Sequence, residues 1–156
     1  MSSHARPSME AEPSHAETPD LATARNAVVD GRWAEAVYHF RDSDEHEKLS
    51  ADDLDSYGEA LWWTGRNREA IVVRERAFAA HDSAGDVQRA TVTALALVDY
   101  NNNWNGTGVA SGWARRVERL LAGRPESKEQ GGLERIRLNM ALHRGDLDAA
   151  LAHADE

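Results

Sequence analysis

The sequence contains no cysteine, and its other scarcities are equally informative. Without cysteine, disulfides and thiolate metal sites are excluded, which suits a reducing compartment. No apolar run approaches the ~20 residues that span a bilayer, and no apolar stretch follows a basic N-terminal start. Basic residues number 18 against 27 acidic ones, and the formal charge of −9 argues against a phosphate-binding body. These absences predict a cytoplasmic protein without a membrane segment.

Proline is scarce beyond the N-terminus. Three of the four prolines, Pro7, Pro13 and Pro19, stand among Ser, His, Ala and Glu in the first nineteen residues. This segment has too little apolar content to offset the entropy of ordering, so residues 1–17 are predicted to be a disordered tail. Residues 18–156 then form one domain, with Thr18 as the first N-cap and Pro19 at the first helical position.

Alternating β-branched runs bounded by turn signals are also missing, and every strong periodicity is helical. The pattern predicts an all-α fold with helices near 20–30, 33–43, 51–64, 67–83, 87–103, 109–122, 128–143 and 147–156. Capping-box spacing or a single polar residue predicts helix starts at Ser50 with Asp53, Ser127 with Gln130, Asp86, Thr107 and Asp146. Helices are expected to stop at Gly31, Gly65, Gly85, Gly123 and Gly145.

Three stretches share one template: DGRWAEAV at 30–37, TGRNREAI at 64–71 and RGDLDAAL at 144–151. Each has a glycine, a short turn, and an alanine five residues after the glycine. The first two copies lie 34 residues apart, and the degenerate NGTGVASGWA near Gly106 marks a turn between the second copy and the last. Repeated helix pairs at this period indicate a solenoid, in which each pair buries its apolar face against its neighbours.

These residues resemble the tetratricopeptide repeat (TPR). In the second repeat the matching positions are Leu54, Tyr57, Gly58, Leu61, Gly65, Ala70 and Ala77. The first repeat matches at Ala24, Gly31, Ala36 and Phe40, and the last at Ala141, Gly145 and Ala150, with Leu138 at a usually small position; the third is longer and matches poorly. The resemblance covers roughly 18–156 and implies a right-handed superhelical, TPR-like solenoid of about four antiparallel helix pairs. Fold alone names no ligand.

The paired tryptophans of GEALWWTGRNREA raise a separate question, because neighbouring side chains on a helix point about 100° apart. Projected on a helix from Ser50, a core stripe contains Leu54, Tyr57, Gly58 and Leu61. An adjacent arc contains Asp52, Asp55, Glu59, Trp62 and Trp63, and in TPR proteins the equivalent arc lines a concave peptide-binding groove. Trp62 is expected to be half-buried and Trp63 to face the groove. The alternative is that both rings pack against the next repeat.

The same register adds further residues to the predicted groove: Tyr100, Asn103 and Trp104 from the next unit, and Arg135, Asn139 and His143 from the last. Aromatic faces beside carboxylates attract Arg and Lys side chains, and rigid rings are frequent binding anchors. A basic peptide or protein segment is therefore the expected partner.

Catalytic and cofactor patterns are poor by comparison, so no catalytic, cofactor or metal residue is assigned and the chain is predicted not to be an enzyme. No G-x-S-x-G, S-x-x-K, Walker or dinucleotide motif occurs. The acidic run 42–53 around His46 lacks the central glycine of an EF-hand and is expected to be a solvated loop. His39 and His143 stand too isolated to be ligands. Arg115, Arg116 and Arg119 lie on a basic amphipathic stretch that contacts phosphate or an acidic partner, or simply faces solvent, the simpler interpretation.

The chain stops inside an expected second-of-pair helix, with no polar capping helix to cover Leu147 and Leu151. We therefore expect a fragment of a longer protein, with self-association or fraying at this end. The phrases EALWWTGRNREAIVVRERAFAAH and RVERLLAG resemble the TPR sensor region of large bacterial LuxR-type helix-turn-helix transcriptional regulators. That resemblance implies a noncatalytic interaction or sensor module, with DNA binding in a domain absent from this chain. The alternative is an accessory helical-repeat region attached to an enzyme such as a cyclase, kinase or sigma-factor-like protein.

Overall fold

The structure is a computed structural model that describes residues 20–46, 49–104, 106–124 and 128–146. Within these ranges it contains seven α-helices and no strand, which confirms the predicted all-α class. The helices are α1 (Leu21–Val29), α2 (Trp33–His46), α3 (Ala51–Trp63), α4 (Asn67–Ser83), α5 (Val87–Trp104), α6 (Thr107–Leu121) and α7 (Lys128–Arg144). The predicted tail, 1–17, and the predicted eighth helix, 147–156, lie outside the described residues, as do Leu147 and Leu151.

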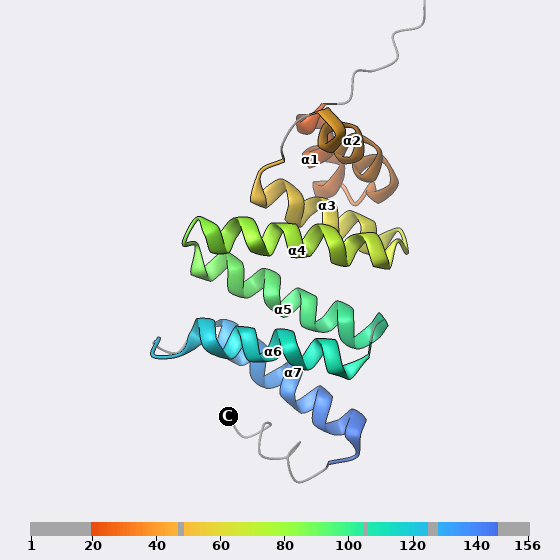
Figure 1. Cartoon of the computed structure of the whole chain (residues 1–156). Helices are drawn as coiled ribbons and strands as arrows, with labels where there is room; N and C mark the ends of the chain where they lie inside the picture. The colour runs from red at the N-terminus through yellow and green to blue at the C-terminus, as the bar shows by residue number, and fades with distance from the viewer. Residues whose placement is uncertain (1–19, 47–48, 105, 125–127, 147–156) are drawn as a thin grey trace, which may run out of the picture.

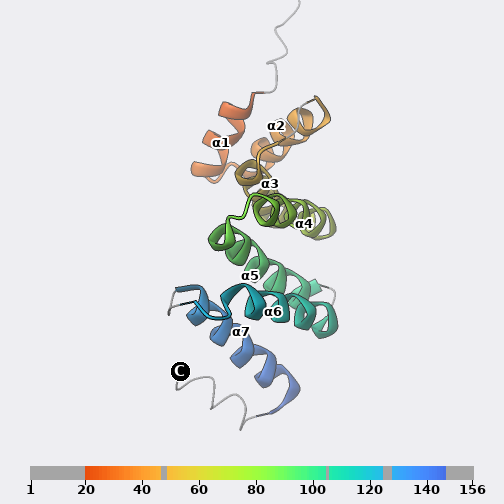
Figure 2. The same cartoon turned by 60° about the vertical axis from the view of Figure 1, so that its left-hand side comes forward.

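Each helix packs against the next one in the chain, from α1 to α7. Figures 1 and 2 show the helices stacked in chain order, with α1 at one end and α7 at the other. Two contacts skip a helix, because α1 also touches α3 and α5 also touches α7. The α3–α4 and α5–α6 connections lie on the same side of the stack in Figure 1. This arrangement agrees with neighbouring helix pairs, while the superhelical TPR path stays a prediction.

Helix starts follow the predicted caps in part. Ser50 Oγ accepts a bond from the Asp53 amide at 3.1 Å, and the Asp86 carboxylate accepts one from the Arg89 amide at 3.0 Å, so both predicted caps are confirmed. The first helix instead begins at Leu21 with Asp20 as its N-cap, so the prediction of Thr18 as N-cap is wrong. The prediction of Thr107 as N-cap is also wrong, because Thr107 is the first residue of α6 and the cap position holds Gly106, which has no capping side chain. The predicted cap Ser127 lies outside the described residues. The predicted cap Asp146 is described, but the helix that it was predicted to start is not.

Helix ends use one recurring turn. At Gly65 the amide of the glycine bonds to Trp62 O at 3.0 Å, and the next amide, of Arg66, bonds to Leu61 O at 2.9 Å. This turn needs a left-handed residue after the helix, and Gly65 supplies it with φ 75°. The other predicted stops, Gly31, Gly85, Gly123 and Gly145, also have positive φ.

The glycine turn is more general than the repeat template. Gly85 and Ala90 reproduce the glycine and the alanine five residues later at the α4–α5 connection, which joins two predicted pairs. Ala90 is fully buried there, as Ala70 is after Gly65. The template therefore marks a close helix connection with a small residue at the following crossing, and it recurs both within and between the predicted pairs.

The core consists largely of small residues at helix crossings and a few larger ones between them. Each of the described helices has at least one fully buried alanine, and the largest fully buried apolar side chains are Phe40, Leu61, Leu97, Ile136, Val98 and Val117. On α3 the predicted core stripe is confirmed, since all four of its members are buried. Among the described residues, no helix is both long and apolar enough to cross a membrane.

The acidic run 42–53 departs from its prediction as a solvated loop. The helix α2 continues to His46, where His46 Nδ1 lies 2.7 Å from the Asp42 carbonyl oxygen. The run then resumes in the first turn of α3, where Asp53 is buried. Carboxylates in this run lie in the first turn of α3 or form ion pairs. A high density of acidic residues is therefore not sufficient evidence for a loop.

Candidate functional site

The two neighbouring tryptophans of α3 have different environments, as the helical projection predicted. Trp62 is half-buried and stacks on Tyr100 of α5, with ring centroids 3.9 Å apart and planes 5° apart. Trp63 is 61% exposed, and its ring lies 6.0 Å from that of Trp33 in α2 at an interplanar angle of 20°. One ring therefore fixes α5 against α3, while the other lies at the surface beside the start of α2.

A third tryptophan lies near this pair. Trp104 is the last residue of α5, one helical turn beyond Tyr100, and it is 49% exposed. The Trp62–Tyr100 stack brings the last turns of α3 and α5 close together. We use the name aromatic edge for Trp33, Trp63 and Trp104, which lie at the start of α2, the end of α3 and the end of α5.

Asp55, predicted to line the groove, instead belongs to a polar cluster between helices. Its carboxylate accepts hydrogen bonds from Arg74 Nη1 at 2.7 Å and from Thr93 Oγ1 at 2.9 and 3.0 Å. His81 Nε2 lies 2.8 Å from Asp55 Oδ2, and since a carboxylate only accepts, this nitrogen carries the hydrogen. We call Asp55, Arg74, His81 and Thr93 the polar cluster; it joins α3, α4 and α5.

The path of Arg74 through this interface depends on Gly58. A Cβ at position 58 would lie 2.7 Å from Arg74 Cγ and 3.1 Å from its Cδ. Because glycine leaves this space open, the Arg74 stem crosses α3 and its guanidinium reaches Asp55. The guanidinium also lies 5.6 Å from the centre of the Tyr100 ring. The position that the TPR resemblance assigns to a small residue is thus filled by an arginine stem.

Tyr100, also predicted for the groove, is buried beneath Trp62 and beside Arg74. Burial raises the pKa of the Tyr100 hydroxyl, with the positive charge of Arg74 acting in the opposite direction. The hydroxyl therefore stays neutral at physiological pH. Tyr100 backs the aromatic edge from inside and is not part of its exposed surface.

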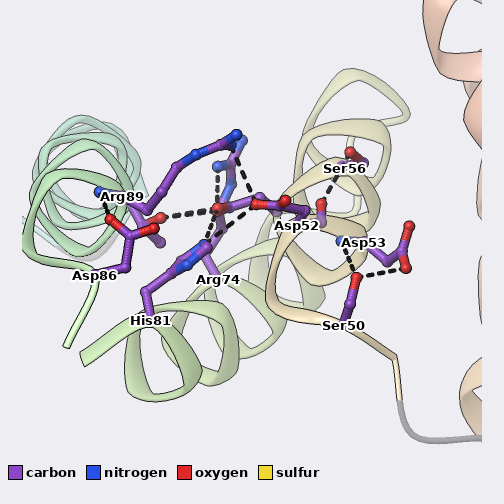
Figure 3. Close-up of polar contacts among 10 residues, drawn as sticks. Ser50, Asp52, Asp53, Ser56, Arg74, His81, Asp86 and Arg89 are labelled. Atoms are coloured by element: carbon purple, nitrogen blue, oxygen red, sulfur yellow. Dashed lines mark hydrogen bonds and ion pairs between the residues drawn. The ribbon is translucent and has the colours of Figure 1, made fainter. Parts of the chain in front are cut away.

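Asp52 is exposed, as expected, but it already has a cationic neighbour. Its carboxylate lies 3.1 Å from Arg89 Nη1 and 3.9 Å from His81 Nε2. Figure 3 shows the Asp52, His81 and Arg89 side chains drawn together from α3, α4 and α5. Glu59 differs, because it forms no ion pair within the described part of the chain. Of the three predicted groove carboxylates, Glu59 keeps the most freedom to meet an outside cation.

The remaining predicted groove residues are dispersed. Asn103 is exposed and donates to the Asp99 carbonyl at 2.7 Å, within its own helix. Arg135 is exposed and pairs with the Asp99 carboxylate at 3.2 Å. Asn139 is half-buried and has a polar interaction of its own, while the side chain of His143 lies outside the described part. The structure thus gives no evidence that α7 continues the aromatic edge.

A second interhelix ion pair lies closer to the N-terminus. Arg25 of α1 binds both oxygens of Asp53 at 2.7 and 2.8 Å, and Ser50 Oγ donates to the same carboxylate at 2.6 Å. Together with the Ser50 cap, the Arg25 bonds hold the pKa of Asp53 below its ordinary value, although burial acts in the other direction. Figure 3 shows Ser50 and Asp53 at the start of α3.

Sequence reasoning missed four residues that shape this region: Trp33, Arg74, His81 and Thr93. One signal was present, since Arg74 and His81 lie seven residues apart and interrupt the apolar stripe of α4. A charged residue at a stripe position opposite Gly58 indicates a buried partner across the interface. No local signal pairs Trp33 with Trp63, because their contact depends on how α2 packs on α3.

Chemically, the carboxylate, guanidinium, imidazole and hydroxyl of the polar cluster bond to one another, and Arg74 Nε is its one buried nitrogen that lacks a hydrogen-bond partner within the described part of the chain. The aromatic edge offers exposed ring faces instead. Comparison of the chain with protein-family models, with curated proteins and with solved structures finds no match.

Proposed function

We propose that this chain is a noncatalytic, TPR-like helical-repeat module that binds a segment of another protein at the aromatic edge. The observation that carries the proposal is the exposure of Trp63 and Trp104 at the ends of α3 and α5, which the Trp62–Tyr100 stack joins. Exposed aromatic side chains held by a firm scaffold are typical binding anchors, because they lose little side-chain entropy on binding.

The partner chemistry follows from the charge next to the rings. Glu59 lies one helical turn before Trp63 and so shares its side of α3. A Lys or Arg side chain can contact the Trp63 ring face and pair with the Glu59 carboxylate at the same time. Asp52 and Asp55 contribute little to this attraction, since Arg89 and Arg74 already form ion pairs with them. We therefore propose that the bound segment has only a few Lys or Arg residues. Aromatic contact contributes more to its binding than charge does.

The proposed setting is the sensor region of a bacterial LuxR-type transcriptional regulator. It rests on the resemblance of EALWWTGRNREAIVVRERAFAAH and RVERLLAG to such regions. Under this proposal the module transmits the presence of its protein partner to a DNA-binding domain elsewhere in the longer protein.

A peptide-binding experiment tests the proposal. Labelled peptide pools that contain Lys and Arg, their Gln counterparts, and Asp and Glu are titrated against the chain at low salt. We expect the basic pool to bind best, with a change in tryptophan fluorescence. Trp63→Ala should lose at least about tenfold in affinity, or about 1.4 kcal/mol. Glu59→Gln should weaken only the preference for basic over neutral peptides.

Tyr38→Ala is the matched control, because Tyr38 is also 61% exposed but lies over His39, apart from the aromatic edge. It should bind like the wild type. Thermal unfolding of each variant separates lost binding from lost fold. The proposal fails if no pool binds, or if Trp63→Ala and Tyr38→Ala behave alike.

A further inference from the structure

The arginines of this acidic chain fall into two groups. Most of those in the described part form ion pairs with carboxylates of the same chain: Arg25, Arg32, Arg66, Arg74, Arg76, Arg89, Arg135 and Arg137. None of the ion pairs within that part involves Arg115, Arg116 or Arg119, which are all exposed on α6. Among the arginines whose side chains are described, Arg41, Arg68 and Arg124 are the others without an ion pair, and they lie on α2, on α4 and after α6. Unpaired guanidinium groups are thus concentrated on one helix.

The arrangement of α6 explains why these side chains point outward. Its core stripe, Ala110, Ala114, Val117 and Leu121, packs inward at helical spacing. The three arginines fall between these positions, on the opposite side. The one carboxylate of α6, Glu118, is bound by Arg137 of α7 at 2.6 Å and so does not neutralise them. We call Arg115, Arg116 and Arg119 the arginine face.

Arg116 is held in place rather than freely solvated. Its guanidinium carbon lies 4.8 Å from the centre of the Phe78 ring and 5.4 Å from that of Trp113. Phe78 is buried and Trp113 half-buried, with an edge contact between their rings 5.1 Å apart. A guanidinium held against an aromatic surface has lost part of its freedom in advance, and a nearby low-dielectric surface strengthens its pairing with an anion.

We propose that the arginine face binds an acidic segment of a partner protein, through carboxylate pairing centred on Arg116. Guanidinium groups pair with carboxylates in a two-bond geometry that lysine cannot match. The chain carries a formal charge of −9 overall, so an acidic segment depends on guanidinium groups that the chain's own carboxylates leave unpaired, such as these. This site is separate from the aromatic edge and does not rest on the function proposed above.

Charge also favours a polypeptide over a nucleic acid as the occupant. Nonspecific nucleic-acid binding typically neutralises about 6 to 10 phosphates along an extended basic surface. The arginine face covers little more than one helical turn, so its three guanidinium groups supply too few contacts for such an extended polyanion. A short acidic segment needs no more than the few contacts that this face offers.

The test uses a labelled peptide of glutamate, glycine and serine, its glutamine counterpart, and a labelled DNA duplex. We expect the whole chain to bind the glutamate peptide best, with affinity that falls as salt rises. Replacing all three arginines by glutamine should weaken this binding at least about tenfold. Because Arg116 also packs on Phe78, the double variant Arg115→Gln, Arg119→Gln is measured beside it and should show a smaller loss with an unchanged melting temperature.

The matched control replaces Arg32, Arg66 and Arg89 by glutamine. Arg32 and Arg89 are exposed and Arg66 is half-buried, all three are already paired, and the change in net charge equals that of the arginine-face variant. Trp63→Ala should also bind the glutamate peptide normally, which separates this site from the aromatic edge. The proposal is overturned if the control loses as much affinity as the arginine-face variants, if the glutamate and glutamine peptides bind alike, or if the duplex binds more tightly than the peptide.

Discussion

The α3–α4–α5 interface and the outer face of α6 use the same residue type in opposite ways. At the interface, the Arg74 side chain crosses over Gly58 and its guanidinium forms an ion pair with Asp55. On α6, Arg116 lies on Phe78 and Trp113 and no ion pair engages it within the described part. The difference shows that net charge alone does not predict a binding surface. What matters is whether a neighbouring helix supplies a carboxylate.

Breaking the interface at its centre should have the largest effect. Asp55→Ala removes the acceptor shared by Arg74, His81 and Thr93, and leaves a nearly buried guanidinium without its charge partner. Losing one partner of a buried pair costs about 3 kcal/mol or more. Arg119→Ala on the exposed face should cost less than about 0.5 kcal/mol. Urea unfolding of both variants makes the comparison, and similar losses would show that the two regions do not differ.

The two neighbouring tryptophans of α3 compare a half-buried ring with an exposed ring on the same helix. Trp62→Ala removes a half-buried ring and its stack on Tyr100, so we expect a loss of about 2 to 3 kcal/mol. Trp63→Ala should lose less than about 1 kcal/mol, because its ring is mostly exposed and touches the protein chiefly at Trp33. Melting curves followed by circular dichroism measure both. A larger loss for Trp63 would place it in the core.

Two glycines inside helices sharpen the comparison further. A methyl group at position 58 meets the Arg74 stem, so Gly58→Ala should destabilise by about 1 to 2 kcal/mol, although alanine favours helix. Gly112 on α6 has nothing within 4 Å of an added Cβ, so Gly112→Ala should stabilise by about 0.5 to 1 kcal/mol. Opposite signs in urea unfolding are the expected result. Two stabilising substitutions would mean that Arg74 does not need the open space at Gly58.

The Arg25–Asp53 pair extends the comparison to α1, with a smaller effect. The pKa of Asp53 is lower in the folded than in the unfolded chain, so its ionised form stabilises the fold above the ordinary aspartate pKa. That stability is lost as pH falls through the lowered pKa. Since Arg25 is largely exposed, we expect about 1 kcal/mol or less. The stability difference between wild type and Asp53→Asn should shrink in acid, and a difference independent of pH would contradict the account.

Much of the fold could be predicted from the sequence, because helical period, glycine stops and caps are local signals. Gly65, Ser50 and the core stripe around Leu61 behave as expected. The candidate site was predicted less well, since a projection along one helix cannot show what the next helix contributes. The helical projection places Asp55 and Trp63 on the same arc of α3, but only Asp55 meets an arginine and a histidine from α4. The side chains that α4 places against α3, and not the helical position on α3, determine which of these residues stays exposed.

Arginine footprinting in the folded chain tests this division most directly. A dicarbonyl reagent that attacks accessible guanidinium groups is applied briefly, and modified sites are located by mass spectrometry after digestion with a protease that does not cleave at arginine. The account predicts rapid modification of Arg115 and Arg119, slower modification of Arg116, and strong protection of Arg74 until the chain is unfolded. Comparable rates at Arg74 and Arg119 in the folded chain would contradict it.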